Sequence, residues 1–364
     1  MEKRVVVAMS GGVDSSVAAA LLKSQGYTVI GITMSFHFSG DSAKQNGCCG
    51  RQEIEDAERV AHKIGIKHYV INMQRELKER VIKNFCREYL RGRTPNPCVR
   101  CNQYIKFDGL LKKTFSLGAE FLATGHYACI ERASKPEFKT SGLLLKKGKD
   151  KLKDQSYFLY LLSQRQLKHI IFPIGEYTKY EVRNLARKFE LPVADKSASQ
   201  EICFLPHDDY RKFLRQRLKA KIKPGLIKDQ EGNVIGKHKG IAYYTIGQRE
   251  GLGIAKGYPV YITYLDTKTH AITVGRKDEL LKRQFLVSNP HFILEPVKKK
   301  VAAYVRIRYN HKEARALIEP LGNKIRVRFS SPQFAITPGQ SAVFYHGDIV
   351  LGGGIIDSSV QLSA

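Results

Sequence analysis

The sequence is poor in acidic residues and has no long apolar run. Of its 364 residues, 34 are Asp or Glu and 61 are Lys or Arg, which gives a formal net charge of +27. The longest apolar stretches, such as residues 17–22, are far too short to span a bilayer. The apolar run at residues 5–9 is also too short for a signal peptide, and no transit segment precedes it. We therefore expect a cytoplasmic protein that has no membrane partner.

Cysteine is scarce as well, with seven residues in the chain. In a reducing compartment these thiols stay mostly reduced, so a Cys-x-x-Cys pair indicates metal binding, redox chemistry or catalysis rather than a structural disulfide. Hydrophobic residues make up 43% of the chain, which excludes a disordered basic tail. A folded protein with this charge typically binds polyphosphate, either as nucleic acid or at an anionic membrane surface.

We find no internal repeat and no long low-complexity linker, and the chain divides by its periodicity. In the first half, apolar runs alternate with helical patterns, which predicts an α/β fold with a doubly wound parallel sheet. The expected strands are residues 5–8, 28–34, 67–72 and 121–124, and the expected helices are residues 15–24, 54–64, 77–90 and 105–117. Such sheets bind their ligands at the carboxyl ends of the strands.

After about residue 205 the pattern changes to one basic helix and many short strand-like runs. The helix is expected at residues 208–218, and the runs at 241–246, 259–265, 301–307, 324–329, 341–345 and 349–351. Frequent glycine turns between them predict a small mixed α/β domain followed by a C-terminal β-barrel or sandwich. The predicted domains are a catalytic domain at 1–205, a central domain at 206–282 and a C-terminal domain at 283–364.

A glycine-rich turn follows the first expected strand and opens the first helix. It reads Ala8-Met9-Ser10-Gly11-Gly12-Val13-Asp14-Ser15. Free amides, a helix N-terminus and serine hydroxyls favour a bound phosphate, and Asp14 could hold Mg²⁺ or cap the helix. No Walker A lysine follows and the spacing is not GxGxxG. The alternative is a tight turn with an ordinary serine cap, but the string resembles the pyrophosphate loop of N-type ATP pyrophosphatases, which adenylate an acceptor oxygen.

Two further segments carry cysteine. The first is Pro95-Asn96-Pro97-Cys98-Val99-Arg100-Cys101-Asn102, and the second is Ser199-Gln200-Glu201-Ile202-Cys203-Phe204. A thiolate is a strong nucleophile that can carry sulfur as a persulfide, and Arg100, Lys106 and a nearby helix N-terminus would lower a thiol pKa. The alternatives are half of a zinc site, completed by Cys48 and Cys49, or a structural role. Cys86 and Cys129 are expected in the core.

These segments occur in a fixed order with other motifs. The others are Ala123-Thr124-Gly125-His126-Tyr127-Ala128, Lys153-Asp154-Gln155-Ser156-Tyr157-Phe158, Tyr244-Thr245-Ile246-Gly247-Gln248-Arg249, Pro338-Gly339-Gln340 and Gly352-Gly353-Gly354-Ile355-Ile356. Together they resemble the bacterial tRNA-specific 2-thiouridylases over essentially the whole chain. The resemblance implies an ATP pyrophosphatase domain, a small central domain and a C-terminal β-barrel.

The resemblance also implies a reaction. Family members replace the C2 oxygen of the wobble uridine in the tRNAs for Lys, Glu and Gln by sulfur. ATP with Mg²⁺ adenylates that oxygen and releases pyrophosphate, and sulfur from a cysteine persulfide then displaces AMP. A cysteine desulfurase or sulfur-relay protein is the implied donor, and the anticodon arm of tRNA is the implied partner.

Site residues follow from the resemblance by position. The phosphates of ATP are expected to be bound by the glycine-rich turn, which comprises Ala8, Met9, Ser10, Gly11, Gly12, Val13, Asp14 and Ser15. Met34 and Gly125 are expected to line the adenine and ribose side. The target base is expected to face Asn96, Pro97 and Cys98. Further tRNA contacts are expected from His126, Lys153, Asp154, Gln155, Arg308, Tyr309 and Gln340. Cys101 matches the family nucleophile, and Cys203 matches the cysteine that receives the persulfide.

The chain departs from the family pattern at Cys98, where many members have Asp. A thiol has a reference pKa near 8.5, against about 3.9 for Asp, so a base-like role for this position is doubtful here. An alternative hypothesis is that Cys98, Cys101 and Cys203 hold a [4Fe–4S] cluster with one open iron that delivers sulfide.

Basic residues gather at 146–153, 211–223 and 298–300, which indicates a surface that follows phosphates. Three other functions fit parts of the sequence. A small-molecule adenylating ligase or amidotransferase needs neither paired cysteines nor a basic surface. An RNA-binding scaffold with a decayed nucleotide site would not keep the intact loop with both Cys101 and Cys203. A 4-thiouridine synthase usually carries an N-terminal RNA-binding module, for which a loop starting at Ser10 leaves no room.

Overall fold

The structure is a computed structural model that describes residues 3–36, 50–133, 142–197, 202–205, 209–254 and 256–357. The chain forms two compact units. Unit 1 comprises Met1–Val81, Cys98–Asp208 and Asp348–Val350, and unit 2 comprises Ile82–Pro97, Asp209–Gly347 and Leu351–Ala364. Cys48, Cys49 and the Ser199–Glu201 part of the second cysteine segment lie outside the described residues.

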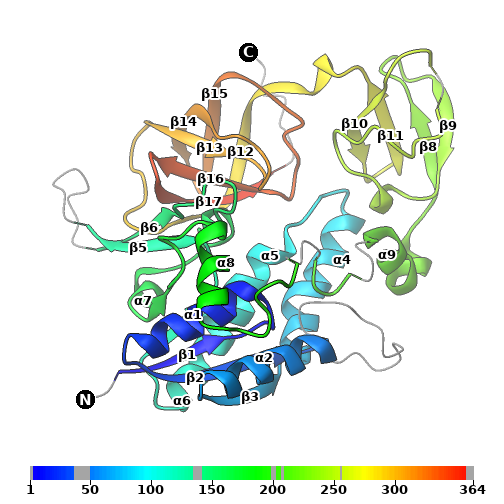
Figure 1. Ribbon diagram of the computed structural model, residues 1–364. Helices are drawn as coiled ribbons and strands as arrows, with labels where there is room; N and C mark the ends of the chain where they lie inside the picture. Colours follow the sequence, from blue (N-terminus) through cyan, green and yellow to red (C-terminus); the bar gives the residue numbers. More distant parts are fainter. Residues whose placement is uncertain are drawn as a thin grey trace. The chain divides into compact units, whose positions relative to one another are not determined.

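Unit 1 is built on a parallel sheet, as predicted, but this sheet has five strands where four were expected (Figure 1). The strand order is β3 (Lys67–Asn72), β2 (Thr28–Ser35), β1 (Arg4–Ala8), β4 (Phe121–Thr124) and β7 (Ile170–Ile171). The valines of the central strand β1 are fully buried, as expected for a strand covered on both faces. Helices α1 (Val13–Ser24), α2 (Arg51–Lys63) and α8 (Lys179–Lys188) contribute to one hydrophobic core with this strand.

The order of this sheet locates a ligand site. From β1 the chain adds β2 and β3 on one side, and then returns to add β4 and β7 on the other side. The loops that follow β1 and β4 therefore leave neighbouring strands at the point where the winding reverses. Open parallel sheets bind ligands in the crevice at this point, outside the carboxyl ends of the strands.

The expected long helices at 77–90 and 105–117 are wrong in detail. The first is divided into α3 (Gln74–Glu76), the π-helix η1 (Leu77–Ile82) and α4 (Lys83–Leu90). The second begins earlier, as α5 (Pro97–Cys101), and continues through the π-helix η2 (Asn102–Leu110) into α6 (Leu111–Ser116). A period of 3.6 residues does not reveal π turns, which are frequent at functional sites.

Unit 2 contains residues 82–97, which the sequence placed in the catalytic domain. The apolar face of α4 packs on α9 (Tyr210–Leu218), and this packing explains the assignment. The rings of Phe85 and Phe213 lie 6.1 Å apart, and those of Tyr89 and Tyr210 stack at 5.0 Å.

A four-stranded sheet follows α9 in unit 2, with the order β10 (Tyr261–Asp266), β11 (Ala271–Gly275), β8 (Gly225–Lys228) and β9 (Val234–His238). It has a core of its own around Ile227, Ile262 and Ile272. The strand-like run expected at 241–246 is wrong, because Ile241–Tyr243 forms the 3₁₀-helix η7. Ile241 and Ala242 are both buried there, so the alternation required of a strand is absent.

The C-terminal part of unit 2 is a closed β-barrel. Its strands are β12 (Leu281–Phe292), β15 (Lys324–Phe334), β14 (Ala314–Leu321), β13 (Val301–Arg306), β16 (Ser341–His346) and β17 (Ile349–Ile356), in that order. Pairing of β12 with β17 closes the barrel. A Cβ at Gly352 would lie 2.1 Å from the carbonyl oxygen of His291, so this closing seam requires glycine.

The remaining elements are short. They are β5 (Ala128–Arg132), β6 (Leu143–Lys147), η4 (Ser156–Phe158), α7 (Gln164–Leu167), η6 (Lys219–Lys221) and η8 (Asp278–Leu280). Among the described residues, no helix combines the length and the apolar character that crossing a membrane requires.

Candidate nucleotide and thiol site

The glycine-rich turn lies between β1 and α1, at the carboxyl edge of the sheet. Gly11 has a positive φ of 68°, and a Cβ on it would lie 2.2 Å from the carbonyl oxygen of Glu53 in α2. Only glycine fits at this position without moving α2. Gly12 precedes the first turn of α1 and has an extended conformation, with φ −98° and ψ 163°.

Serine hydroxyls hold the shape of this turn. The Ser10 amide donates to Oγ of Ser15 at 3.1 Å, and that hydroxyl donates to the Gly12 carbonyl at 3.2 Å. The hydroxyl of Ser16 donates to the same carbonyl at 2.8 Å. The amides in the first turn of an α-helix have no partner within the helix, and they carry partial positive charge. This twelve-residue helix therefore offers oriented donors for an anion.

The segment after β4 lies against the same turn. A Cβ at Gly125 would lie 2.7 Å from the carbonyl carbon of Asp14 and from the amide nitrogen of Ser15. The structure thus brings Gly125 together with the predicted loop, across the point where the sheet reverses. Met34, the penultimate residue of β2, is half-buried at the same edge of the sheet.

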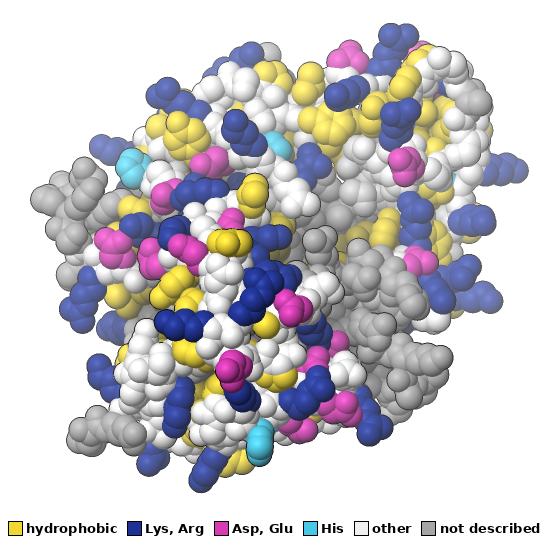
Figure 2. Space-filling view, in the orientation of Figure 1, with side chains coloured by type: hydrophobic (Ala, Val, Ile, Leu, Met, Phe, Trp, Pro, Cys, Tyr) yellow, Lys and Arg dark blue, Asp and Glu magenta, His cyan; other side chains and the backbone are white. Residues whose placement is uncertain are grey.

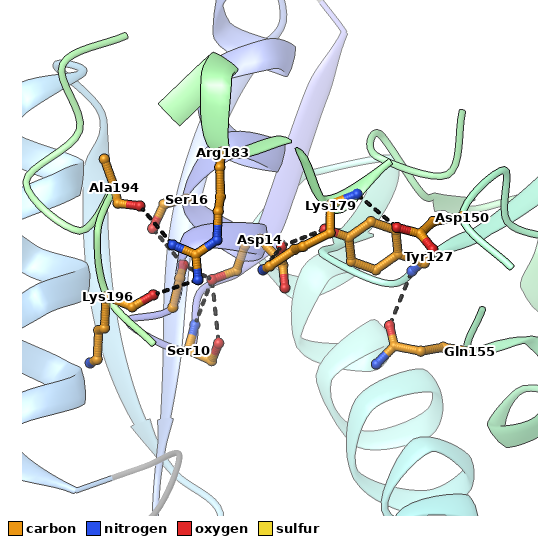
Figure 3. A network of polar contacts seen from close by, with 12 residues as sticks. Ser10, Asp14, Ser16, Tyr127, Asp150, Gln155, Lys179, Arg183, Ala194 and Lys196 are labelled. Carbon is orange, nitrogen blue, oxygen red and sulfur yellow. Dashed lines mark hydrogen bonds and ion pairs between the residues drawn. The ribbon is translucent and has the colours of Figure 1, made fainter. Parts of the chain in front are cut away.

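Asp14 is held by two donors, as Figure 3 shows. Its Oδ1 accepts a hydrogen bond from the Tyr127 hydroxyl at 2.7 Å and forms an ion pair with the Lys179 ammonium at 2.6 Å. Burial and the neighbouring Asp14 charge raise the pKa of Tyr127, so the hydroxyl stays a donor. Of the two roles expected for Asp14, the helix cap is wrong, because Gly12 is the N-cap residue of α1 and the helix start has no side-chain cap.

Further side chains orient these two donors. The Gln155 side-chain oxygen accepts from the backbone amide of Tyr127 at 3.0 Å. The backbone amide of Lys179 donates to Asp150 at 2.9 Å. Sequence reasoning missed Lys179 and assigned Tyr127 no role of its own, although Tyr127 lies within the motif at residues 123–128.

The first cysteine pair lies at the start of a continuous helical stretch. The helix begins at Pro97, a residue favoured in the first position because it needs no amide partner there. Cys98 is exposed, whereas Cys101 is half-buried at the junction with the π-helix η2. Arg100 donates to the Tyr104 hydroxyl at 3.0 Å and lies over its ring.

The second cysteine segment contributes Cys203, which is half-buried in a turn beside the buried Phe204 and Leu205. Of the two cysteines expected in the core, Cys86 is buried and Cys129 is half-buried. In the described part of the chain, which includes Cys98, Cys101 and Cys203, no three His, Cys, Asp or Glu side chains gather into a group that could hold a metal ion. The cluster hypothesis therefore gains no support, and Cys48 and Cys49, which would complete the zinc site, lie outside the described residues.

Several residues expected to contact tRNA also make contacts inside unit 1. His126 is buried, and its ring nitrogen Nδ1 shares a hydrogen bond with the Thr124 hydroxyl at 2.6 Å. Burial lowers the pKa of His126 well below the usual value, and the charge of the nearby Lys106 lowers it further. Asp154 is also buried and accepts from two amides and the Ser156 hydroxyl. Lys153 is half-buried. Their contact with tRNA stays a prediction.

The expected tRNA residues in unit 2 also make internal contacts. The Arg308 guanidinium donates to the Phe334 carbonyl at 2.6 Å, and Tyr309 lies beneath the guanidinium of Arg306. The Gln340 side chain donates to the Thr94 carbonyl at 2.9 Å.

The neighbours of Gln340 hold the same loop. The Thr94 amide donates to the Pro338 carbonyl at 2.8 Å, and a Cβ at Gly339 would lie 2.9 Å from the Thr94 amide nitrogen. The Pro338-Gly339-Gln340 motif therefore fixes the loop that leads into the first cysteine segment, at Thr94 and Pro95.

The predicted basic clusters differ in how far they are neutralised. Lys146, Lys149 and Lys151 each form an ion pair with an acidic side chain of unit 1. Helix α9 exposes four basic side chains and contains no acidic residue: Arg211, Lys212, Arg215 and Arg217. Dark-blue Lys and Arg side chains are spread over the face seen in Figure 2, with magenta acidic side chains among them. Helix α9 is therefore a candidate for a phosphate-binding surface, as is the exposed third cluster, Lys298, Lys299 and Lys300.

Comparisons with known proteins match each part of the chain. The family model described as the tRNA methyl transferase HUP domain matches residues 3–207, more than half of the chain. The tRNA methyl transferase PRC-barrel domain matches residues 211–276, and the aminomethyltransferase beta-barrel domain matches residues 282–356.

Curated relatives match over nearly their full length. The tRNA-specific 2-thiouridylase MnmA 2 of Caldanaerobacter subterraneus subsp. tengcongensis is 51% identical over 98% of this chain and 99% of its own. The MnmA 1 enzyme of Thermoanaerobacter sp. is 50% identical over the same shares. The MnmA enzyme of Halothermothrix orenii is 49% identical over 97% of this chain and 98% of its own.

Proposed function

The chain belongs to the family of tRNA-specific 2-thiouridylases, and from this membership we propose that it is an ATP-dependent sulfurtransferase that converts the wobble uridine of tRNA to 2-thiouridine. The observation that carries the proposal is the sequence identity of 50–51% with tRNA-specific 2-thiouridylases over 98% of the chain. The glycine-rich turn at the reversal point of the sheet and the two cysteine segments supply the parts that such a reaction needs.

In the first half-reaction, the C2 oxygen of uridine attacks the α-phosphorus of ATP, and the bond to the β-phosphate breaks. Pyrophosphate leaves, and the uridine carries AMP on its former carbonyl oxygen. The oriented amides of the turn from Gly11 to Ser15 stabilise the negative charge on the phosphates. Mg²⁺ is the usual counter-ion of such phosphates, and Asp14 is the carboxylate within this turn, in the first turn of α1.

In the second half-reaction, the terminal sulfur of a Cys203 persulfide attacks C2, and AMP leaves with the oxygen. The Cys101 thiolate then attacks Sγ of Cys203, which breaks the sulfur–sulfur bond and leaves 2-thiouridine with a Cys101–Cys203 disulfide. In one alternative, the Cys101 thiolate takes the terminal sulfur from Cys203, the resulting Cys101 persulfide attacks C2, and the Cys203 thiolate then attacks Sγ of Cys101, which leaves 2-thiouridine and the same disulfide. In another, the Cys101 thiolate first attacks Sγ of the Cys203 persulfide, which forms the disulfide and releases sulfide, and this sulfide attacks C2. A dithiol reductant restores the two thiols in the disulfide routes.

The proposed partners are the anticodon arm of tRNA and a protein that delivers persulfide sulfur. Cysteine desulfurases and sulfur-relay proteins are the implied class. The exposed basic side chains of helix α9 support binding of a polyanion. Reaching a base inside the stacked anticodon requires that the base be turned outward, which is the general solution for enzymes that modify bases. The proposed domain boundaries remain those drawn from the sequence, at residues 205 and 282.

The decisive experiment measures sulfur in tRNA and pyrophosphate release in the same reaction. The purified protein is incubated with an unmodified tRNA transcript, Mg-ATP and a persulfide donor, without any methyl donor, and nucleosides are identified by mass spectrometry. We expect 2-thiouridine at the wobble position and pyrophosphate release that depends on tRNA. Pyrophosphate release with a small-molecule acceptor and no tRNA would instead indicate an adenylating ligase.

Single-cysteine variants separate the sulfur routes. We expect Cys101→Ala and Cys203→Ala to abolish thiolation, and Cys98→Ala to retain it, if sulfur travels as a persulfide. Loss of activity in all three variants, with a broad absorbance near 400 nm in anaerobic protein, would instead favour the three-thiolate cluster. Cys129→Ala is the matched control, because this half-buried thiol has a pKa raised to about 12 by burial and by Glu176, and takes no part in either route.

A further inference from the structure

A buried carboxylate in α2 holds a lysine against the back of the glycine-rich turn. Asp56 is 3% exposed and accepts contacts from the Lys196 ammonium, the Arg59 guanidinium and, at 3.0 Å, the Gln52 side chain. The Lys196 ammonium also donates to the carbonyl oxygen of Gly11 at 3.2 Å. Apart from Gly11, none of these residues belongs to the motifs that indicated the function.

Covalent geometry gives this contact a consequence. The peptide bond between Gly11 and Gly12 is trans, since the described chain has no cis peptide. In a trans peptide the carbonyl and the following N–H point in opposite directions. When Lys196 holds the Gly11 carbonyl on the α2 side, the Gly12 N–H is therefore directed to the other side. That amide stands just before the first turn of α1, where the donors for an anion are.

The free backbone of Gly11 makes such a restraint necessary. Glycine loses more conformational freedom on folding than any other residue, and its peptide planes turn most easily. Gly11 is pressed against the Glu53 carbonyl of α2, and Lys196 adds a second restraint that is also anchored in α2, through Asp56. Hydrogen bonds from Lys196, Gln52 and Arg59 outweigh burial and lower the pKa of Asp56, so the carboxylate keeps its charge at neutral pH.

We propose that Lys196, held by Asp56, is a positioning residue that orients the Gly11–Gly12 peptide toward the phosphates of ATP. The proposal rests on the proposed function, because it requires that ATP bind at this turn. Lys196 acts from behind the turn and need not touch the nucleotide. It also begins the segment that leads to Cys203, so the residue that shapes the phosphate site is close in sequence to the sulfur carrier.

The test is steady-state kinetics of tRNA-dependent pyrophosphate release. We expect Lys196→Met to raise the KM for ATP by about tenfold or more, the usual loss for one hydrogen bond to a charged group. The KM for tRNA should change less than about twofold, and Lys196→Arg should recover most of the ATP affinity. Lys63→Met is the matched control, because Lys63 lies in α2, the helix that carries Asp56. The substitution removes an exposed ion pair to Glu190 and should leave both constants unchanged.

A double variant separates positioning from stability. Lys196→Met leaves the buried Asp56 short of one cation, so part of its effect could come from a less stable fold. In Asp56→Asn with Lys196→Met the buried charge is gone, so the urea midpoint should recover while the KM for ATP stays high. Recovery of both would overturn the proposal, as would an unchanged KM in Lys196→Met. If the wild-type protein itself shows no ATP-dependent reaction with tRNA, the proposed function fails first and the positioning role falls with it.

Discussion

Replacing Gly11 by alanine tests the geometry of the glycine-rich turn most directly. The new Cβ would lie 2.2 Å from the Glu53 carbonyl oxygen, and ordinary contact begins near 3.4 Å. The backbone of α2 or of the turn must therefore move by about an ångström, and overpacking of this kind costs about 1–3 kcal/mol. Alanine at the φ of 68° costs a further 1–2 kcal/mol or so.

The adjacent glycine is the matched control. Gly12 has an ordinary extended conformation, and a Cβ on it would have Ser10 Oγ as its nearest neighbour, at 3.6 Å. Alanine at this position reduces the freedom of the unfolded chain, which stabilises the folded protein by about 0.4–1 kcal/mol. A similar amount is lost because alanine is a poorer N-cap residue than glycine. We expect Gly12→Ala to change the free energy of unfolding by less than about 0.5 kcal/mol.

Two measurements compare the variants. Equilibrium unfolding in urea should show Gly11→Ala destabilised by about 2–4 kcal/mol, after the gain from the stiffer unfolded chain is subtracted. Hydrogen exchange of the peptides that cover α1 and α2 should show the loss localised there, which matters because a chain of two units need not unfold in one step. Equal stability of Gly11→Ala and Gly12→Ala would refute the close approach of the turn to α2.

Three other changes probe the contacts around the site. Burial lowers the pKa of His126, so below about pH 6.5 the unfolded chain binds a proton there and the folded chain does not. The free energy of unfolding, measured in urea, should therefore fall from pH 7 to pH 5. In His126→Gln this slope should be smaller by up to about 1.4 kcal/mol per pH unit. Tyr127→Phe removes a hydrogen bond to the charged Asp14 and should lower the unfolding free energy by about 1.5–3 kcal/mol in the same assay, and an unchanged midpoint would contradict the bond. Gln340→Leu frees the Thr94 carbonyl and should lower kcat for thiolation about tenfold with little change in the dissociation constant of tRNA, whereas a changed dissociation constant alone would indicate a direct tRNA contact.

The parallel sheet and its ligand edge could be predicted from the sequence, because apolar runs such as residues 5–8 are local signals. The strands β3 and β4 begin and end at the predicted residues, and β1 differs by one. The π turns at η1 and η2 could not be predicted, since they depend on how buried side chains pack after the helix has formed. The assignment of residues 82–97 to unit 2 depends on contacts such as Phe85 with Phe213, which are distant in sequence.

The site divides in the same way. Glycine, serine and cysteine motifs are contiguous, so the turn at residues 8–15 and the two cysteine segments were visible in the sequence. Lys179, Lys196 and Asp56 were not, because each acts on the turn from a different helix or loop and none stands in a recognisable spacing. Residues that orient a loop can lie anywhere in the sequence that packs against it, whereas residues that carry the chemistry stand in short motifs whose types the reaction requires.

The ion pairs around the turn bear on how a strongly basic chain handles two different polyphosphates. Asp14 is paired with Lys179, and Asp56 with Lys196, so each lysine at the turn already has a carboxylate partner. In the proposed reaction the turn therefore binds the nucleotide mainly through oriented amides and hydroxyls, which recognise phosphate by direction rather than by charge alone. Helix α9 has four exposed cations and no acidic residue, an arrangement that attracts any polyanion over a distance. In the proposed function, the excess of positive charge on α9, in unit 2, thus attracts tRNA, whereas the turn in unit 1 selects the phosphates of ATP by the direction of its donors.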